Sequence, residues 1–164
     1  MRPPMLTDDT LFSSINELAP QIRARRISPV ELTELSLHRL ETLGVRLAAV
    51  AHVMRESALE QAREAEKEIR DGHYRGPLHG IPYGAKDLLA TRDAKTTWGA
   101  APYKDQQFNE DASIIQKLRS AGAILVAKLA MIELAGGMGY NEADASASYP
   151  QITQITQIKK TGAK

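Results

Sequence analysis

The stretch that decides the fold is residues 76–87, Gly76-Pro77-Leu78-His79-Gly80-Ile81-Pro82-Tyr83-Gly84-Ala85-Lys86-Asp87. Its glycines and prolines surround a short apolar run, Ile81 to Ala85, in a pattern typical of turns wrapped round a short strand. This strand leads directly into Lys86 and Asp87. We therefore expect Lys86 to lie at the end of a buried strand, shielded from water.

Lys86 is the first candidate for chemistry in this stretch. Burial disfavours the charged ammonium, so a shielded lysine can act as a neutral base. Such a base can take a proton from a serine hydroxyl, directly or through a relay, and make the serine a competent nucleophile. The alternative is an ion pair between Lys86 and Asp87 or another neighbour, which would only stabilise the turn.

Helical patterns precede this stretch. Apolar residues at spacings of three and four predict one buried helical face near the N-terminus, with a kink or a division into two pieces at Pro20. These residues are Leu11, Ile15, Leu18 and Ile22. Ser28 and Pro29 mark a second helix start, with Glu31 placed to complete a capping box. This helix is expected to end at Gly44 and to bury Leu32, Leu35, Leu40 and Leu43.

A strand and a third helix complete the region before residue 76. The apolar run 47–54 predicts a buried strand. Residues 57–70 predict a helix that ends at Asp71-Gly72. Its inward face is expected to carry Ala58, Ala62, Ala65 and Ile69.

The same alternation continues after Lys86. Residues 92–110 predict a surface loop, and Asp111 is placed to cap a helix that stops at Ala121-Gly122. Residues 123–127 predict a second buried strand that ends at Lys128. A short helix over 131–134 and a glycine loop over 136–139 follow. Helices that alternate with buried strands indicate an α/β fold whose sheet is covered on both faces.

Residues 76–87 strongly resemble the lysine motif of the amidase signature family. The resemblance continues through Thr96-Thr97-Trp98-Gly99, Asp111-Ala112, residues 118–123 and residues 128–135 with the glycine loop that follows. It covers most of residues 10–150. A twelve-residue block with its glycines and prolines in register is far more specific than an isolated glycine motif.

The resemblance implies a fold, a reaction and a site. The fold is an α/β/α sandwich round a mixed sheet, here incomplete and preceded by N-terminal helices. The reaction is hydrolysis of carboxamides, or transfer of ammonia from glutamine, through a Ser–cis-Ser–Lys triad without metal or organic cofactor. Lys86 would be the catalytic base, with substrate-binding residues in the glycine loop at Gly136, Gly137 and Met138.

The serines of that triad have no counterpart in this sequence. The family supplies them from a block resembling Gly-Gly-Ser-Ser-Ser-Gly-Ser, expected soon after Pro150. Here a Gln-Ile-Thr repeat follows instead. Ser146 and Ser148 lack the flanking glycines whose amides would hold an oxyanion. We therefore expect an inactive, truncated amidase, with a sheet that has an unpaired edge.

Composition limits the other functional classes. A formal net charge of +1 gives no electrostatic basis for direct nucleic-acid binding, and no cysteine is present. His73 and His79 have no carboxylate placed to complete a metal site. Neither an apolar run long enough to span a membrane nor a secretory signal is seen, so we expect a cytoplasmic protein. The resemblance implies that its partner is a small-molecule amide substrate. Its oligomeric state is left open.

The predicted organisation has three parts: an N-terminal helical region over 1–72, a partial catalytic core over 73–150, and a low-complexity tail over 151–164. A competing hypothesis treats the chain as a non-catalytic binding or assembly module derived from an amidase. In that hypothesis the helical region forms the surface for a partner.

Overall fold

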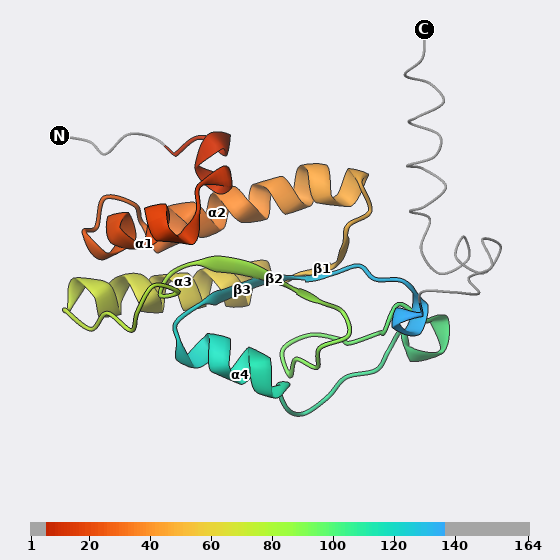
Figure 1. Cartoon of the computed structure of the whole chain (residues 1–164). Coiled ribbons are helices and arrows are strands. Elements are labelled where there is room, and N and C mark those ends of the chain that lie inside the picture. Colours follow the sequence, from red (N-terminus) through yellow and green to blue (C-terminus); the bar gives the residue numbers. More distant parts are fainter. Residues whose placement is uncertain (1–5, 137–164) are drawn as a thin grey trace, which may run out of the picture.

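The computed structural model describes residues 6–136, which form a mixed three-stranded sheet with helices on both faces (Figure 1). Strand β3 (Ile124–Leu129) lies in the middle, between β1 (Val50–Val53) and β2 (Pro82–Lys86). Strand β1 is antiparallel to β3, and β2 is parallel to it. The predicted α/β fold with a mixed sheet is confirmed.

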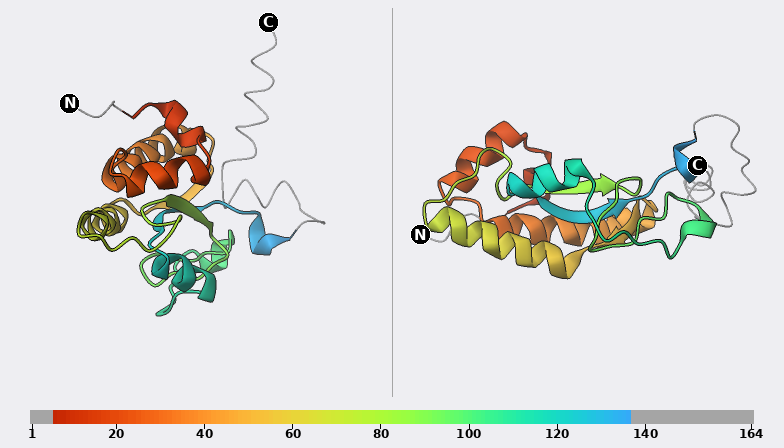
Figure 2. Two further views of the ribbon diagram at one scale, coloured as in Figure 1. Left: turned by 60° about the vertical axis from the view of Figure 1, so that its left-hand side comes forward. Right: turned by 90° about the horizontal axis from the view of Figure 1, so that it is seen from below.

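Side chains of β3 pack into a different core on each face of the sheet. Ile124 and Val126 join a cluster with α2 (Pro29–Arg39) and α3 (Arg55–Arg70). Leu125 joins a cluster that includes Ile115 of α4 (Ser113–Ser120). Figure 2 shows the same layers, with α4 on the opposite side of the sheet from α2. Alternate residues of a strand face opposite sides, so a strand buried on both faces needs a continuous apolar run.

Helix α3 agrees most closely with the sequence analysis. It begins two residues earlier than expected and ends at Arg70. The predicted inward face is confirmed, since Ala58, Ala62, Ala65 and Ile69 are all buried. The small alanines let α3 lie close to α2 and β3.

The start of α2 confirms the cap but not the capping box. The Ser28 hydroxyl oxygen accepts hydrogen bonds from the backbone amides of Val30 and Glu31. Glu31 does not reach back to Ser28 as predicted. The Ser28 hydroxyl donates instead to Glu66 of α3, and this contact connects the two helices.

The end of α2 differs from the predicted apolar face. Leu32 and Leu37 are buried, whereas Leu35 and Leu40 are only half-buried and Leu43 is exposed. The helix passes into a π-helical turn, η2 (Leu40–Gly44). A π turn adds a residue to the helical repeat and so rotates the following side chains away from the expected face. The helix does not end at Gly44 as predicted, because Val45 and Arg46 are still helical.

The N-terminal apolar pattern forms two helical pieces, but they do not divide at Pro20. A 3₁₀ turn, η1 (Asp8–Phe12), precedes α1 (Ile15–Arg23), and Pro20 lies inside α1. The division falls at Ser14, whose backbone amide and hydroxyl both donate to the Glu17 carboxylate, at 2.7 and 2.8 Å. This capping box starts a new helix and decides the position of the break.

Two further expectations are wrong. The strand predicted over 47–54 is shorter, and as an outer strand β1 is half-buried instead of fully buried. Asp111 does not cap α4, because its carboxylate accepts the backbone amide of Arg92 at 2.9 Å and lies 3.2 Å from the Arg119 guanidinium. No helix within residues 6–136 is long and apolar enough to cross a membrane.

Candidate active site

Strands β2 and β3 are parallel, so their carboxyl ends lie at the same edge of the sheet. Lys86 is the last residue of β2, and its Cα is paired with that of Leu129 at the end of β3. The backbone amide of Asp87 donates to the Leu129 carbonyl at 2.9 Å, so the two chains stay paired just beyond the strands. We call this region, residues 86–89 and 95–99 with 128–136, the carboxyl edge.

The Lys86 side chain is exposed, contrary to the expected burial. Within residues 6–136 its ammonium has no hydrogen-bond or ion-pair partner. The predicted alternative, an ion pair with Asp87, is also not formed. Lys86 follows the buried Ala85 and precedes the buried Asp87, so strand alternation directs it away from the core that those two side chains enter.

Asp87 pairs with Lys128 in the interior of the sheet. The Lys128 Nζ lies 2.9 Å from Asp87 Oδ1, and the two side chains are 0% and 1% exposed. Lys128 also donates to the Thr96 hydroxyl at 2.8 Å and to the Lys95 carbonyl at 3.2 Å. The buried ammonium therefore has two hydrogen-bond acceptors and a carboxylate that balances its charge.

The other oxygen of Asp87 anchors the loop that precedes η3 (Ala101–Tyr103). Asp87 Oδ2 accepts the backbone amide of Thr97 at 3.0 Å and its hydroxyl at 2.5 Å. The Asp87 carbonyl accepts the Trp98 amide at 3.3 Å. The predicted surface loop is therefore partly buried, with Thr96 fully enclosed.

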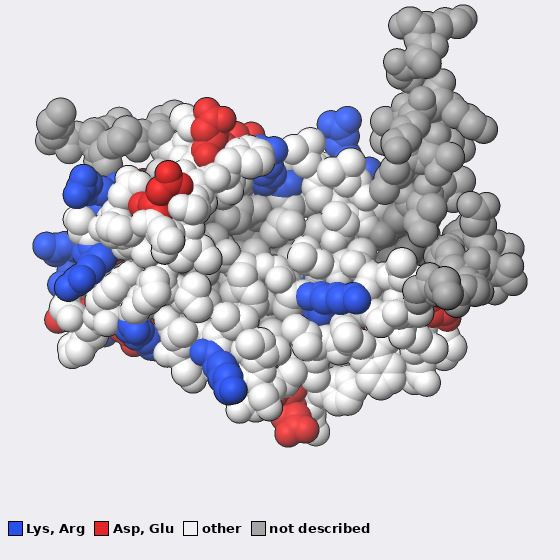
Figure 3. Space-filling model, in the orientation of Figure 1, with Lys and Arg blue, Asp and Glu red and all other residues white. Residues whose placement is uncertain are grey.

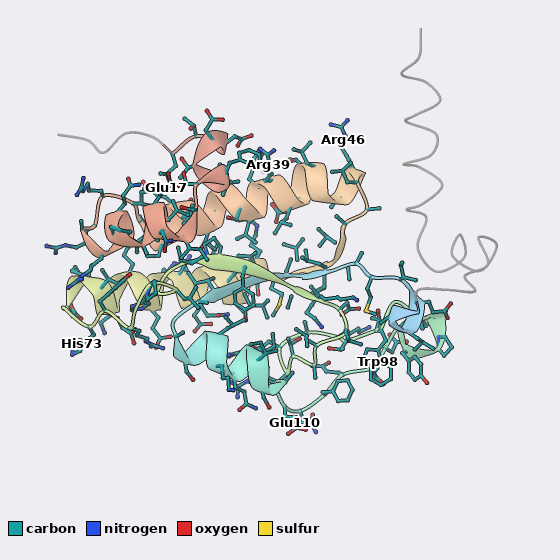
Figure 4. The ribbon with its side chains drawn as sticks, viewed as in Figure 1. Glu17, Arg39, Arg46, His73, Trp98 and Glu110 are labelled. Carbon is teal, nitrogen blue, oxygen red and sulfur yellow. The ribbon has the colours of Figure 1, made fainter. Side chains whose placement is uncertain are left out.

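Trp98 connects this loop to the segment after β3. Its carbonyl accepts the amide of Leu134, in η4 (Glu133–Ala135), at 2.8 Å. Figure 4 shows Trp98 at this end of the molecule, and its ring packs against Tyr103 and Phe108 at centroid distances of 4.9 and 6.0 Å. Gly99 has a φ of +68°, and a Cβ there would lie 2.7 Å from the Met131 carbonyl, so a larger residue would disrupt this junction.

Gly136 is the last described residue of the predicted site. It is exposed, and its amide donates to the Glu133 carbonyl at 2.9 Å. Gly137, Met138, Ser146, Ser148 and the tail over 151–164 lie outside the described residues. The substrate-binding role of Gly136, Gly137 and Met138 stays a prediction.

The amino end of β2 holds a second polar cluster, formed by Glu68, Arg75 and His79. His79 is fully buried; its Nδ1 accepts the Arg75 amide at 3.0 Å, and its Nε2 lies 3.1 Å from Glu68 Oε2. Burial is the largest influence on the His79 pKa and lowers it, against the opposing effect of Glu68. Residues 6–136 contain no group of three or more His, Asp or Glu side chains placed to hold a metal ion. The His79 backbone amide donates to the Gly76 carbonyl at 3.0 Å, so His79 is part of the turn before β2.

Sequence reasoning missed the burial of Lys128. The predicted strand ended at this residue, whereas β3 continues to Leu129. A lysine inside a central strand carries a large desolvation penalty unless it is paired. The available signal was Leu129, which extends the apolar run past the lysine, together with an aspartate at the end of the preceding predicted strand.

A mixed sheet covered by helices, with a titratable side chain at the carboxyl end of a parallel strand, is typical of the catalytic domains of α/β enzymes. The Amidase family model matches residues 31–144, well over half of the chain. The chain therefore belongs to the Amidase family, as its motifs predicted.

Relatives and solved structures agree with this membership. The chain is 43% identical over 132 residues to a Mycobacterium bovis protein named as the amidase AmiD, covering 80% of this chain and 28% of that one. It is 36% identical over 132 residues to one subunit of the glutamyl-tRNA(Gln) amidotransferase of Salinispora tropica, covering 80% and 27%. The peptide amidase of Stenotrophomonas maltophilia superimposes with a TM-score of 0.70 at 32% identity, covering 74% and 25%. The chain thus spans about a quarter of the length of each relative.

Proposed function

We propose that this chain supplies the catalytic lysine of an amidase-type hydrolase that acts on carbon–nitrogen bonds of carboxamides. Membership of the Amidase family supports the reaction class. The observation that carries the role of Lys86 is its state at the carboxyl edge, where it is exposed and, within residues 6–136, unpartnered. The carboxylate next to it in sequence, that of Asp87, is already engaged by Lys128 and Thr97.

In the proposed mechanism the Lys86 amine accepts a proton from a bridging serine, which in turn accepts one from the nucleophilic serine. The nucleophile attacks the amide carbonyl and backbone amides hold the oxyanion. Ammonia or an amine leaves after it receives a proton, and water then hydrolyses the acyl-enzyme. No metal or organic cofactor takes part.

These 164 residues contain no block that resembles the one supplying both serines. A polypeptide of this sequence alone is therefore expected to release no ammonia from simple carboxamides. Any turnover that Lys86→Ala abolishes would show that other residues supply the nucleophile.

The direct test begins with the DNA that follows the codon for Pro150, read in all frames. Where it encodes a Gly-Gly-Ser-Ser-Ser-Gly-Ser block, the protein that joins this block to residues 1–150 is assayed for ammonia release. Loss of a general base is expected to lower kcat by about 10²–10⁴-fold in Lys86→Ala. Lys117→Ala, at an exposed position of α4, is the matched control and is expected to keep full activity.

The second candidate function is a non-catalytic binding or assembly module. The observation in its favour is the extensive core within residues 6–136, with buried clusters on both faces of the sheet. A cooperative urea transition of the 164-residue polypeptide would support a module that folds by itself. A gradual, featureless change in signal would count against it.

A further inference from the structure

The buried ion pair between Asp87 and Lys128, next to Lys86, suggests a role beyond stability. A buried ion pair is generally no more stable than well-packed apolar side chains of the same volume. Here, however, the two charges and their partners join three separate segments: the end of β2, the loop 95–99 and the central strand β3.

We propose that the buried Asp87–Lys128 pair positions Lys86. This inference rests on the proposed function, because it concerns the same lysine. Lys128 acts through Asp87 and does not touch the substrate, so it is a positioning residue and not a catalytic one.

The geometry gives the reason. Asp87 is held at both carboxylate oxygens, by Lys128 at Oδ1 and by Thr97 at Oδ2. Its backbone is held at both polar groups, by the Leu129 carbonyl and the Trp98 amide. Because Asp87 is fixed by these four contacts, the backbone of the preceding residue, Lys86, has little conformational freedom. Burial alternates along residues 84–87, so an inward Asp87 requires an outward Lys86.

Thr96 extends this support to Lys128. Its hydroxyl accepts from Lys128 Nζ at 2.8 Å and lies 3.4 Å from the Leu89 carbonyl, to which it donates. The Lys128 ammonium thus bridges the strand that carries Lys86 and the loop that carries Trp98. A shift in the ammonium would move both segments together.

The variant that separates positioning from stability is Lys128→Met with Asp87→Leu. It replaces both buried charges by apolar side chains, so the chain is expected to unfold cooperatively in urea. The position of Lys86 is followed in the 164-residue polypeptide by ¹³C-dimethylation of its lysines and NMR, with the Lys86 signal assigned from Lys86→Arg. The near-ultraviolet circular dichroism of Trp98, the only tryptophan, reports on the loop.

If the pair positions Lys86, the double variant is expected to shift the Lys86 NMR signal and to reduce the circular dichroism band of Trp98. The Lys117 NMR signal is expected to stay unchanged. Lys95→Met is the matched control, since it removes an exposed lysine that pairs with Asp105 in the same loop. It is expected to leave both signals unchanged. A folded double variant with an unshifted Lys86 signal and an intact Trp98 band would overturn the proposal.

Thr96→Val provides a second test should the double variant fail to fold. It preserves shape and removes one acceptor of the Lys128 ammonium. A smaller shift of the same two signals supports positioning, and unchanged signals contradict it. Neither the Lys86 NMR signal nor the Trp98 band depends on turnover. Failure of the positioning test is therefore distinguishable from failure of the proposed function, which an active Lys86→Ala enzyme would show.

Discussion

The two ends of β2 place their charged side chains differently. At the amino end, the buried His79 lies between Arg75 and Glu68, and both of its ring nitrogens face a polar partner. At the carboxyl end, Asp87 and Lys128 are equally enclosed, but Lys86 beside them is exposed and has no partner within residues 6–136. Figure 3 shows basic side chains in separate groups on one face of the molecule, so exposure alone does not distinguish Lys86.

The difference separates charges that hold the chain in place from the lysine for which we propose a catalytic role. A partnered, buried group is expensive to disturb and therefore fixes the backbone round it. Lys86, next to this fixed point, makes no such contact within residues 6–136, and the base role proposed for it needs an amine that is not engaged elsewhere. The four variants below change one end of β2 at a time.

The largest effect is expected from Lys128→Met. It leaves the Asp87 carboxylate buried without its cation, which costs about 3–5 kcal/mol of folding free energy. The free energy of unfolding is measured in urea and compared with that of the Lys128→Met, Asp87→Leu double variant. If the single variant is no less stable than the double, the pair is not buried as described.

Gly122→Ala tests the amino end. Gly122 has a φ of +80°, and a Cβ there would lie 2.4 Å from the ring of the buried His79. Left-handed backbone and overpacking together are expected to cost about 2–3 kcal/mol. Gly72→Ala is the control, because its φ is +90° but no atom lies within 4 Å of the added Cβ, so only the backbone effect remains.

A smaller effect is expected from pH. Burial lowers the pKa of His79 in the folded chain below its ordinary 6.5, so the unfolded chain binds more protons in the window between the two values. The stability from neutral His79 is complete above pH 6.5 and decreases as the pH falls through this window. Urea midpoints measured at about pH 7.5 and about pH 5.5 bracket the ordinary histidine pKa. His79→Gln should remove this part of the dependence, and an unchanged slope would contradict the assignment.

The smallest effect is expected from Lys86→Met. The side chain is exposed and, within the described part of the chain, makes no polar contact, so the free energy of unfolding should change by less than about 0.5 kcal/mol. The same urea titration provides the measurement. A loss near that of Lys128→Met would mean that Lys86 is a structural residue.

The sequence predicted the parts of the fold that depend on local pattern. The Ala58–Ile69 face of α3 and the Ser28 cap follow from helical spacing and capping chemistry, and the α/β fold follows from apolar runs that alternate with helices. The mixed sheet was implied by the family resemblance. The break between η1 and α1 at Ser14 was not predicted, because both the Ser14 capping box and Pro20 are signals for a helix boundary and the sequence alone does not rank them. The rotation of Leu43 depends on a π turn, which leaves no clear signal in the sequence.

The site was predicted only in part, because its central contact is not local. The lysine block identified the family and Lys86, but Asp87 and Lys128 are far apart in the sequence, and their pairing depends on the register of two parallel strands. The same limit applies to Asp111, whose sequence suggests a helix cap while the fold gives it two arginines.

The most direct test of the central claim compares the two lysines in one experiment. The folded 164-residue polypeptide is treated with a lysine-acylating reagent, and the rate at each lysine is read by peptide mass spectrometry. We predict that Lys86 reacts at the rate of the exposed Lys117, and that Lys128 reacts about 100-fold or more slowly until urea unfolds the chain. A Lys86 as protected as Lys128, or a Lys128 as reactive as Lys117, would contradict the account.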